Sequence, residues 1–320
     1  MIEVNNLVKK YGDKVAIDGL SFNIKEGEVV GLLGLNGAGK STTMNCLTGY
    51  IAPTEGSIKI GGYDLLKDPN KAKKIIGYLP EIFSFYTDMR IVEYLDYVCD
   101  IKGFTKDKKA RKEHIEAICQ QTGISHLSGR MIRNLSKGYK QRVGFAQALI
   151  GNPKVIILDE PTVGLDPSQI IEIRQLIKDS GKESTVIVSS HILSEIQAIC
   201  SRIILIHEGH IAFDGPIESI GKNITEGREV IVRVKGSRED VEAVLKSIPQ
   251  IASFRHMEVK EPGCEDFTVE GKEGTDIREL LFKGFSEKGL TLLQLYGKEI
   301  SLESTFLQLT GQEKKGGEQK

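Results

Sequence analysis

The chain has 320 residues, of which 27% are charged and 40% are hydrophobic, and its formal net charge at pH 7 is −1. This length allows one large and one smaller domain, with a core sizeable enough to need no disulfide or metal for stability. The near-neutral balance, with an isoelectric point of about 6.6, lacks the basic excess typical of nucleic-acid binding, so no nucleic-acid partner is expected.

The cysteines and apolar runs indicate the cellular compartment. Five cysteines are scattered along the chain without a CxxC pair, which argues against a disulfide framework or a zinc site and favours a reducing compartment. The start of the chain lacks a basic region followed by an apolar stretch, so no signal peptide is expected. The longest apolar runs, at 155–158 and 203–206, are far shorter than the roughly 20 residues that cross a bilayer. The sequence predicts a cytoplasmic protein whose membrane role must come through a partner.

The first 220 residues alternate short apolar runs with helical stretches, a pattern typical of an α/β domain with a largely parallel sheet. Residues 15–24 alternate as a half-buried strand, and 28–33, 155–158 and 185–188 have the denser apolar pattern of buried strands. Between about 77 and 150 the pattern changes to helical periodicity with many lysines. An inserted helical subdomain is expected there.

A second domain is predicted over 221–310. Its elements follow the order β-α-β-β-α-β, which matches a small α+β unit of the split-βαβ, ferredoxin-like kind. A last helix is expected at 302–309, and residues 311–320 have nothing to bury and predict a disordered tail. The expected strands and helices are, in chain order, 229–235, 237–247, 252–259, 266–270, 276–287 and 290–296.

A glycine-rich segment at 34–42 has the GxxxxGKS pattern of a phosphate-binding loop and stands between an expected strand and an expected helix. Glycines let backbone N–H groups converge on phosphate oxygens, and the N-terminus of the following helix adds its dipole. Lys40 supplies a positive charge for the β- and γ-phosphates, and Ser41 offers a hydroxyl to Mg²⁺. The predicted nucleotide-binding residues of the loop are Gly34, Asn36, Gly37, Ala38, Gly39, Lys40, Ser41 and Thr42.

Two carboxylates follow the buried run 155–158, at the edge of the sheet where ligands of open α/β sheets bind. Asp159 is suited to the Mg²⁺ shell, as in the Walker B element, and Glu160 is positioned to polarise a water for attack on the γ-phosphate. Taken alone, two acids after an apolar strand are more often a solvated strand end. The phosphate loop upstream favours the catalytic interpretation.

Further segments resemble, in order and spacing, those of the ABC-type ATPases. Leu-Ser-Lys-Gly-Tyr at 135–139 is similar to the LSGGQ signature of that family, and 161–167 is similar to its D-loop. His191 matches the switch histidine, and Tyr11 matches the aromatic residue that stacks on adenine. The resemblance covers about residues 1–220. It implies an α/β P-loop ABC ATPase core that binds ATP with Mg²⁺ and hydrolyses it, with Glu160 and His191 as catalytic residues.

The resemblance also implies a second subunit. Ser136 and Gly138, at the start of the signature helix, would contact the γ-phosphate held by the opposite subunit of a head-to-tail dimer around two MgATP. That subunit would be a second copy of this chain or a paralogue. Without the resemblance, Ser136 would be interpreted as a helix N-cap, His191 as an ordinary histidine and Tyr11 as a strand-end aromatic.

The chain departs from the family pattern at two places. Glu81 stands where many members have a glutamine. A carboxylate ~4 Å from a phosphate oxygen is repelled by several kcal/mol at an effective dielectric of ~20 unless Mg²⁺ lies between them, so Glu81 is expected to be a metal or water ligand. In the signature, Lys137 and Tyr139 replace a glycine and a glutamine, and Lys137 would add positive charge near the γ-phosphate of the partner.

These motifs predict the ATP-hydrolysing subunit of an ABC transporter that works with a separate integral membrane permease. The C-terminal unit resembles an extension found mostly on exporter subunits. The expected location is the inner face of the cell membrane, reached through the permease, whose coupling helix would bind the aromatic-rich segment 82–97. A soluble ABC ATPase of cofactor assembly and a nucleotide-binding regulator without hydrolysis remain as alternatives. For the C-terminal unit, a role in dimerisation or regulation agrees with the sequence as well as contact with the permease does.

Overall fold

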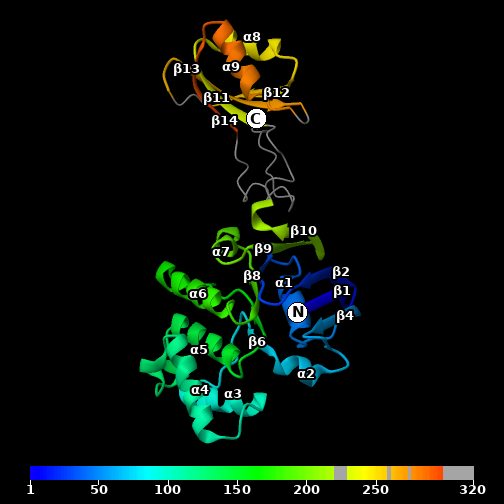
Figure 1. Ribbon diagram of the computed structural model, residues 1–320, viewed down its shortest axis with the longest axis vertical. Helices are drawn as coiled ribbons and strands as arrows, with labels where there is room; N and C mark the ends of the chain where they lie inside the picture. Colours follow the sequence, from blue (N-terminus) through cyan, green and yellow to red (C-terminus); the bar gives the residue numbers. More distant parts are fainter. Residues whose placement is uncertain (220–228, 258–260, 273–274, 298–320) are drawn as a thin grey trace. The chain divides into compact units, whose positions relative to one another are not determined.

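The computed structural model divides into two compact units, Met1–Ile217 and Glu218–Lys320, and each has its own hydrophobic core (Figure 1). Within the part of the chain that the structure describes, no helix is both long enough and apolar enough to cross a membrane. The described residues are 1–219, 229–257, 261–272 and 275–297.

A six-stranded sheet of order β10-β9-β3-β8-β7-β6 forms the centre of the first unit. All its neighbouring strands pair in parallel except β10 with β9. Every residue of β7 and β8 is buried, which explains their unbroken apolar runs. The strands are β3 (Val29–Leu33), β6 (Ile76–Leu79), β7 (Val155–Leu158), β8 (Thr185–Ser190), β9 (Arg202–His207) and β10 (His210–Pro216).

The first unit also has a separate antiparallel sheet of order β2-β1-β4-β5, which the prediction of one largely parallel sheet did not include. Residues of this sheet, of helix α1 and of the parallel strands share one core, for example Leu7, Met44 and Ile157. The phosphate loop is thereby held between two sheets. The elements are β1 (Ile2–Tyr11), β2 (Lys14–Ile24), α1 (Lys40–Leu47), β4 (Glu55–Ile60) and β5 (Tyr63–Asp64).

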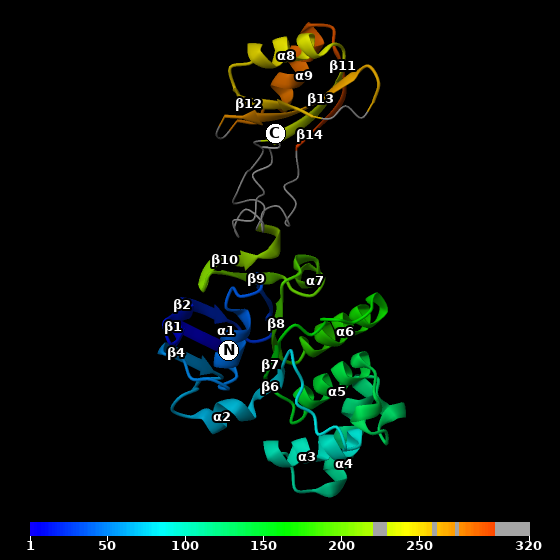
Figure 2. The same ribbon diagram turned by 180° about the vertical axis from the view of Figure 1, so that it is seen from behind.

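Helices α3, α4 and α5 gather on one side of the first unit, as Figure 2 shows, where an inserted helical subdomain was expected. The expected region also contains strand β6, which begins at Ile76 and belongs to the parallel sheet. A side chain on Gly77 would collide with the Ala148 carbonyl, so this strand depends on close contact with the end of α5. The helices of the unit are α2 (Pro69–Lys74), α3 (Ile91–Lys102), α4 (Lys108–Gln121), α5 (Lys137–Leu149), α6 (Pro167–Ser180) and α7 (Leu193–Gln197).

In its described residues, the second unit is an antiparallel sheet of order β12-β13-β11-β14 with two helices. Alternate residues of β11 (Val230, Val232, Val234) are buried against Phe267 and the helix residue Phe285. The helix expected at 302–309 and the tail expected at 311–320 lie outside the described residues. The elements are β11 (Glu229–Lys235), α8 (Arg238–Ser247), β12 (Ile251–His256), β13 (Cys264–Gly271), α9 (Arg278–Glu287) and β14 (Thr291–Gly297), in the predicted order.

Candidate active site

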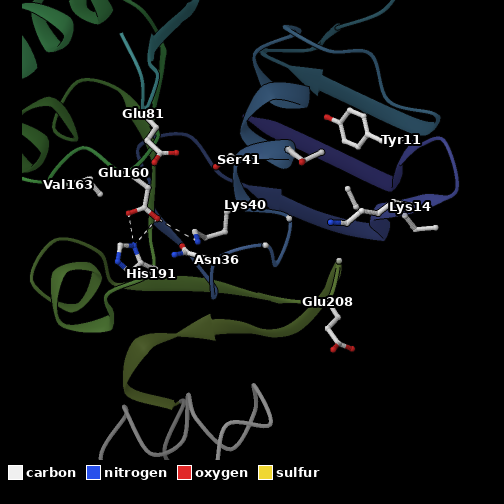
Figure 3. Close-up of a pocket in the computed structure, with 16 residues that line it drawn as sticks. Tyr11, Lys14, Asn36, Lys40, Ser41, Glu81, Glu160, Val163, His191 and Glu208 are labelled. Carbon is white, nitrogen blue, oxygen red and sulfur yellow. Dashed lines mark hydrogen bonds and ion pairs between the residues drawn. The ribbon is translucent and has the colours of Figure 1, made fainter.

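A pocket of about 700 Å³ lies where β3, β7 and β8 end (Figure 3). Because the carboxyl ends of parallel strands meet at one edge of the sheet, residues far apart in sequence converge there. The pocket brings together ten of the residues predicted from sequence: Tyr11, Asn36, Gly37, Gly39, Lys40, Ser41, Thr42, Glu81, Glu160 and His191. Val163, from the segment that resembles the D-loop, lines it too, together with residues outside every motif: Lys14, Val15, Ala16, Glu208 and Gly209.

The loop between β3 and α1 needs its glycines for close packing. A Cβ on Gly34 would lie 2.5 Å from the Ile206 carbonyl, and one on Gly39 would lie 2.8 Å from the Ala16 carbonyl. Gly39 has a φ of 113° and is the N-cap of α1, which has no side-chain cap. The first N–H groups of α1 are therefore free to bind an anion.

Lys40 is buried beneath this loop and is 5% exposed. Its Nζ donates hydrogen bonds to the carbonyls of Gly34 at 2.7 Å and Leu35 at 3.3 Å. The same Nζ lies 3.5 Å from Oε1 of Glu160, as the close-up shows (Figure 3). Lys40 thus joins the phosphate loop to the carboxylate predicted as the base.

Glu160 is 6% exposed and has a φ of 47°, a left-handed conformation that is uncommon for a residue other than glycine. Its carboxylate oxygens lie 3.0 and 3.1 Å from Nδ1 of His191. The backbone N–H of Glu160 donates to Oγ of Ser189 at 2.8 Å. The carboxylate is therefore held between a lysine and a histidine, and its backbone is held by a buried serine.

Asp159 lies behind Glu160 and is 3% exposed. Burial raises the pKa of Asp159 above its ordinary value, and the hydrogen bond from Ser189 opposes this rise. The negative charge of Glu81 raises the pKa of Asp159 further. Glu81 follows β6, whose last residue pairs with the end of β7, so chain topology places these two carboxylates close together.

The oxygen groups around Asp159 fit a magnesium ion. The Ser41 hydroxyl lies near enough to Asp159 to lower its pKa, and the negative charge of Glu81 raises it. Mg²⁺ prefers hydroxyl, carboxylate, phosphate and water oxygens, and it rarely has an all-protein cage. The described residues contain no cluster of three or more His, Cys, Asp or Glu that could hold a metal alone, so phosphates and waters would have to complete such a site.

Five predicted residues do not line this pocket: Gly34, Ala38, Asp159, Ser136 and Gly138. The first three belong to the phosphate loop or precede Glu160 directly, whereas the last two lie in the signature. Ser136 is the N-cap of α5, and its Oγ accepts from the Tyr139 N–H at 3.5 Å. Gly138 is buried against the Gln169 side chain. The neighbouring Lys137 reaches Gly164 in the segment that resembles the D-loop. Within one chain, the signature residues therefore do not join the phosphate loop.

The motifs also left several supporting residues without a role. Ser189 and Ser190 precede His191, and Ser189 contacts the carboxylate of Asp159 and the backbone N–H of Glu160. Glu195 is a buried acid four residues after His191, and it is the only charged residue in the sequence between His191 and Arg202. That isolated charge is the sequence signal that could have indicated Glu195.

Comparison with known proteins agrees with this geometry. Residues 17–163 match the family described as "ABC transporter". The chain is 34% identical over 314 residues to the bacitracin transport ATP-binding protein BcrA of Bacillus licheniformis, covering 97% of each chain. This chain belongs to the ABC transporter ATP-binding proteins. As a member of that family it is an ATPase, and the predicted P-loop ABC ATPase core is confirmed.

Two further ABC relatives match over different extents. The linearmycin resistance ATP-binding protein LnrL of Bacillus subtilis is 32% identical over 312 residues, which cover 97% of this chain and 98% of LnrL. A solved dimeric ATP-binding cassette, in a post-hydrolysis state with ADP and Pi, is 28% identical with a TM-score of 0.62. It covers 68% of this chain and 98% of its own. The likeness to BcrA and LnrL thus extends through the second unit, whereas the solved cassette matches about two thirds of the chain.

Proposed function

We propose that this chain is the ATP-hydrolysing subunit of an ABC exporter, and that it acts on a separate membrane permease from the inner face of the cell membrane. The observation that carries the proposal is the buried group of Lys40, Glu160 and His191 beside the phosphate loop. The names of BcrA and LnrL, a transport and a resistance protein that match 97% of this chain, support the export role.

The proposed mechanism begins when the phosphates of ATP enter the loop. Lys40 exchanges its contact with Glu160 for the β- and γ-phosphates, which leaves Glu160 free to accept a proton from the attacking water. His191 keeps the Glu160 carboxylate oriented through Nδ1. When bound, Mg²⁺ would neutralise phosphate charge and would be held by Ser41 and Asp159, with Glu81 as a ligand directly or through water.

We assign the remaining nucleotide contacts to adenine stacking and to a second subunit. Tyr11 lines the pocket and is 50% exposed, so its ring is available to stack on adenine. Ser136 and Gly138 lie outside the pocket of their own chain, which supports their action on ATP bound by a second copy or a paralogue. The solved cassette with ADP and Pi is dimeric, which also supports this arrangement.

The segment after Glu81 is our candidate for permease contact. Part of its aromatic set is internal: Phe85 stacks on Phe83 and meets the buried Tyr94 edge-on. Ile82 and Tyr86 are 81% and 54% exposed and accessible to a partner, and Tyr86 also packs edge-on against Tyr97. A pocket of about 570 Å³ lies between α3 and α4, and three of its lining residues belong to this segment: Val92, Glu93 and Asp96. The others lie on α4: Lys108, Arg111, Lys112, Ile115 and Glu116.

We further propose that residues 1–220 are the nucleotide-binding domain, with a helical subdomain at about 77–150, and that 221–310 form an accessory domain of the ferredoxin-like kind. The β-α-β-β-α-β order and the strand order β12-β13-β11-β14 support this assignment for the second unit. Its own buried core supports an independent domain.

One experiment tests both hydrolysis and the permease. A tagged Glu160→Gln chain should bind ATP but hydrolyse it at least about 100-fold more slowly than the wild type, because only the proton acceptor is lost. ATP should trap it as a dimer, and mild-detergent extracts of its native cells should yield the dimer together with a polytopic membrane protein. Nucleotide binding, turnover and co-purifying proteins are measured on the same preparation.

The matched control is Lys40→Ala, which should weaken ATP binding itself, because it removes the cation of the phosphate loop. A wild-type rate for Glu160→Gln would exclude Glu160 as the base. Recovery of the trapped dimer solely from the soluble fraction, with an assembly scaffold, would contradict the export role and leave the ATPase assignment in place.

A further inference from the structure

A buried glutamate behind the active-site pocket joins two of its loops. Glu195 lies in the first turn of α7 and is 7% exposed. Its Oε2 accepts hydrogen bonds from Oγ1 of Thr162 at 2.5 Å and from Oγ of Ser190 at 3.2 Å. No Lys, Arg or His among the described residues forms an ion pair with it. A buried carboxylate is costly without such partners, so the two hydroxyls are its main stabilisation.

The first hydroxyl belongs to the segment that follows the proposed base. Thr162 is two residues after Glu160, in the loop that leads to α6. The preceding residue, Pro161, accepts a hydrogen bond through its carbonyl from Nε2 of Gln141 at 2.6 Å. Gln141 lies on α5, the helix that begins at the signature. This loop is therefore held on one side by the signature helix and on the other by Glu195.

The second hydroxyl belongs to the loop that carries the switch histidine. Ser190 directly precedes His191, and its Oγ also accepts from the N–H of Ile192 at 3.0 Å. That hydrogen bond closes the turn around His191, whose Nδ1 contacts the carboxylate of Glu160. A ring of contacts therefore runs from Glu160 through Thr162, Glu195 and the turn at Ser190 back to His191 and Glu160.

We propose that Glu195 is a positioning residue for ATP hydrolysis, because it holds the loop of Thr162 and the loop of His191 at a fixed separation. Neither Glu195 nor Thr162 lines the nucleotide pocket, so their effect on turnover passes through Glu160 and His191. Loss of the Thr162 hydroxyl lets the two loops move apart, and the carboxylate and the imidazole lose their common orientation. The inference rests on the proposed roles of Glu160 and His191.

The test compares two substitutions at one position in the full chain, with its membrane partner if turnover requires it. Thr162→Val keeps the shape of the side chain and removes the hydroxyl, and Thr162→Ser keeps the hydroxyl. Thr162→Val should lower kcat about 10- to 100-fold, the size of effect that small misplacements of catalytic groups have. Its KM for ATP should stay within about twofold of wild type, because ground-state binding is untouched. Thr162→Ser should keep most of the wild-type kcat.

A wild-type kcat for Thr162→Val overturns the inference, and so does an equal loss in both variants. If Thr162→Val does not fold, Ser190→Ala is compared with Ser184→Ala, which removes a buried hydroxyl bonded to the Pro153 carbonyl near the other end of β8. A kcat loss confined to Ser190→Ala supports the inference, and equal rates overturn it. Failure of the proposed function gives a different result from failure of this inference. In that case Glu160→Gln hydrolyses ATP at the wild-type rate.

Discussion

Ser189, a single fully buried side chain at the end of β8, contacts both acidic residues of the active site. Its Oγ donates to Oδ1 of Asp159 at 2.5 Å and accepts from the backbone N–H of Glu160 at 2.8 Å. A left-handed backbone at a residue other than glycine costs of order 1–3 kcal/mol and persists only where its surroundings hold it. The Ser189 hydroxyl therefore supports the conformation that points Glu160 into the pocket.

Ser189→Ala should lower kcat about tenfold and raise the Mg²⁺ concentration needed for half-maximal hydrolysis, because Asp159 and Glu160 both lose a fixed partner. Steady-state hydrolysis at a series of Mg²⁺ concentrations measures both effects. The control is Ser180→Ala in α6, which removes a buried hydroxyl bonded to the Leu176 carbonyl, away from the pocket. Equal kinetics in the two variants would contradict the role of Ser189.

At the scale of elements, α3 stabilises the end of α5. The last carbonyls of a helix have no partner within it and favour a nearby cation. Lys102, the last residue of α3, donates from Nζ to the carbonyls of Ala148 at 3.3 Å and Ile150 at 2.8 Å. Burial of the ammonium group lowers the pKa of Lys102 from 10.5 to about 8. Lys102 thus joins α3 to the end of α5 within the helical subdomain. No carboxylate among the described residues forms an ion pair with it.

This lowered pKa predicts a pH-dependent stability. Between about pH 8 and 10.5 the folded chain loses the Lys102 proton while the unfolded chain keeps it, so stability rises with pH in that window. Relative to Lys102→Met, the wild type should gain about 1–2 kcal/mol of unfolding free energy from pH 7 to pH 9.5. Urea unfolding of both proteins at the two pH values measures the gain. An unchanged difference between them would show that Lys102 titrates normally.

At the scale of the whole molecule, the chain is two units with separate cores. Leu32, Met44 and Ile157 belong to the core of the first unit, and Val232 and Phe285 belong to that of the second. All residues of the candidate site described above come from the first unit. Because each unit buries its own apolar surface, neither requires the other for its local packing.

A chain that ends at residue 219 should therefore fold and bind ATP with an affinity within about threefold of the full chain. The comparison is made by circular dichroism melting and by titration with a fluorescent ATP analogue. The same truncation carrying Lys40→Ala serves as the control for specific binding. An aggregated fragment, or one that folds without binding ATP, would show that the second unit contributes to the nucleotide site.

The sequence by itself determined those strands and motifs whose pattern lies within a short run of neighbouring residues. The runs at Val155–Leu158 and Glu229–Lys235 were predicted with their observed bounds, because apolar clustering and period-two alternation are local properties. The loop at 34–42 and the two acids that follow β7 were predicted for the same reason. The residues that carry the chemistry of these two motifs are consecutive in the sequence.

Tertiary structure alone decided which distant groups meet. The antiparallel sheet depends on pairing between β1 and β4, and the strand that begins at Ile76 is stabilised by the end of α5, so both depend on contacts between segments distant in sequence. Glu160 and His191 are 31 residues apart in sequence, and Thr162 and Glu195 are 33 apart. Buried polar groups take whichever partners the packed sheet edge brings within hydrogen-bond distance, and no short window of sequence contains that information.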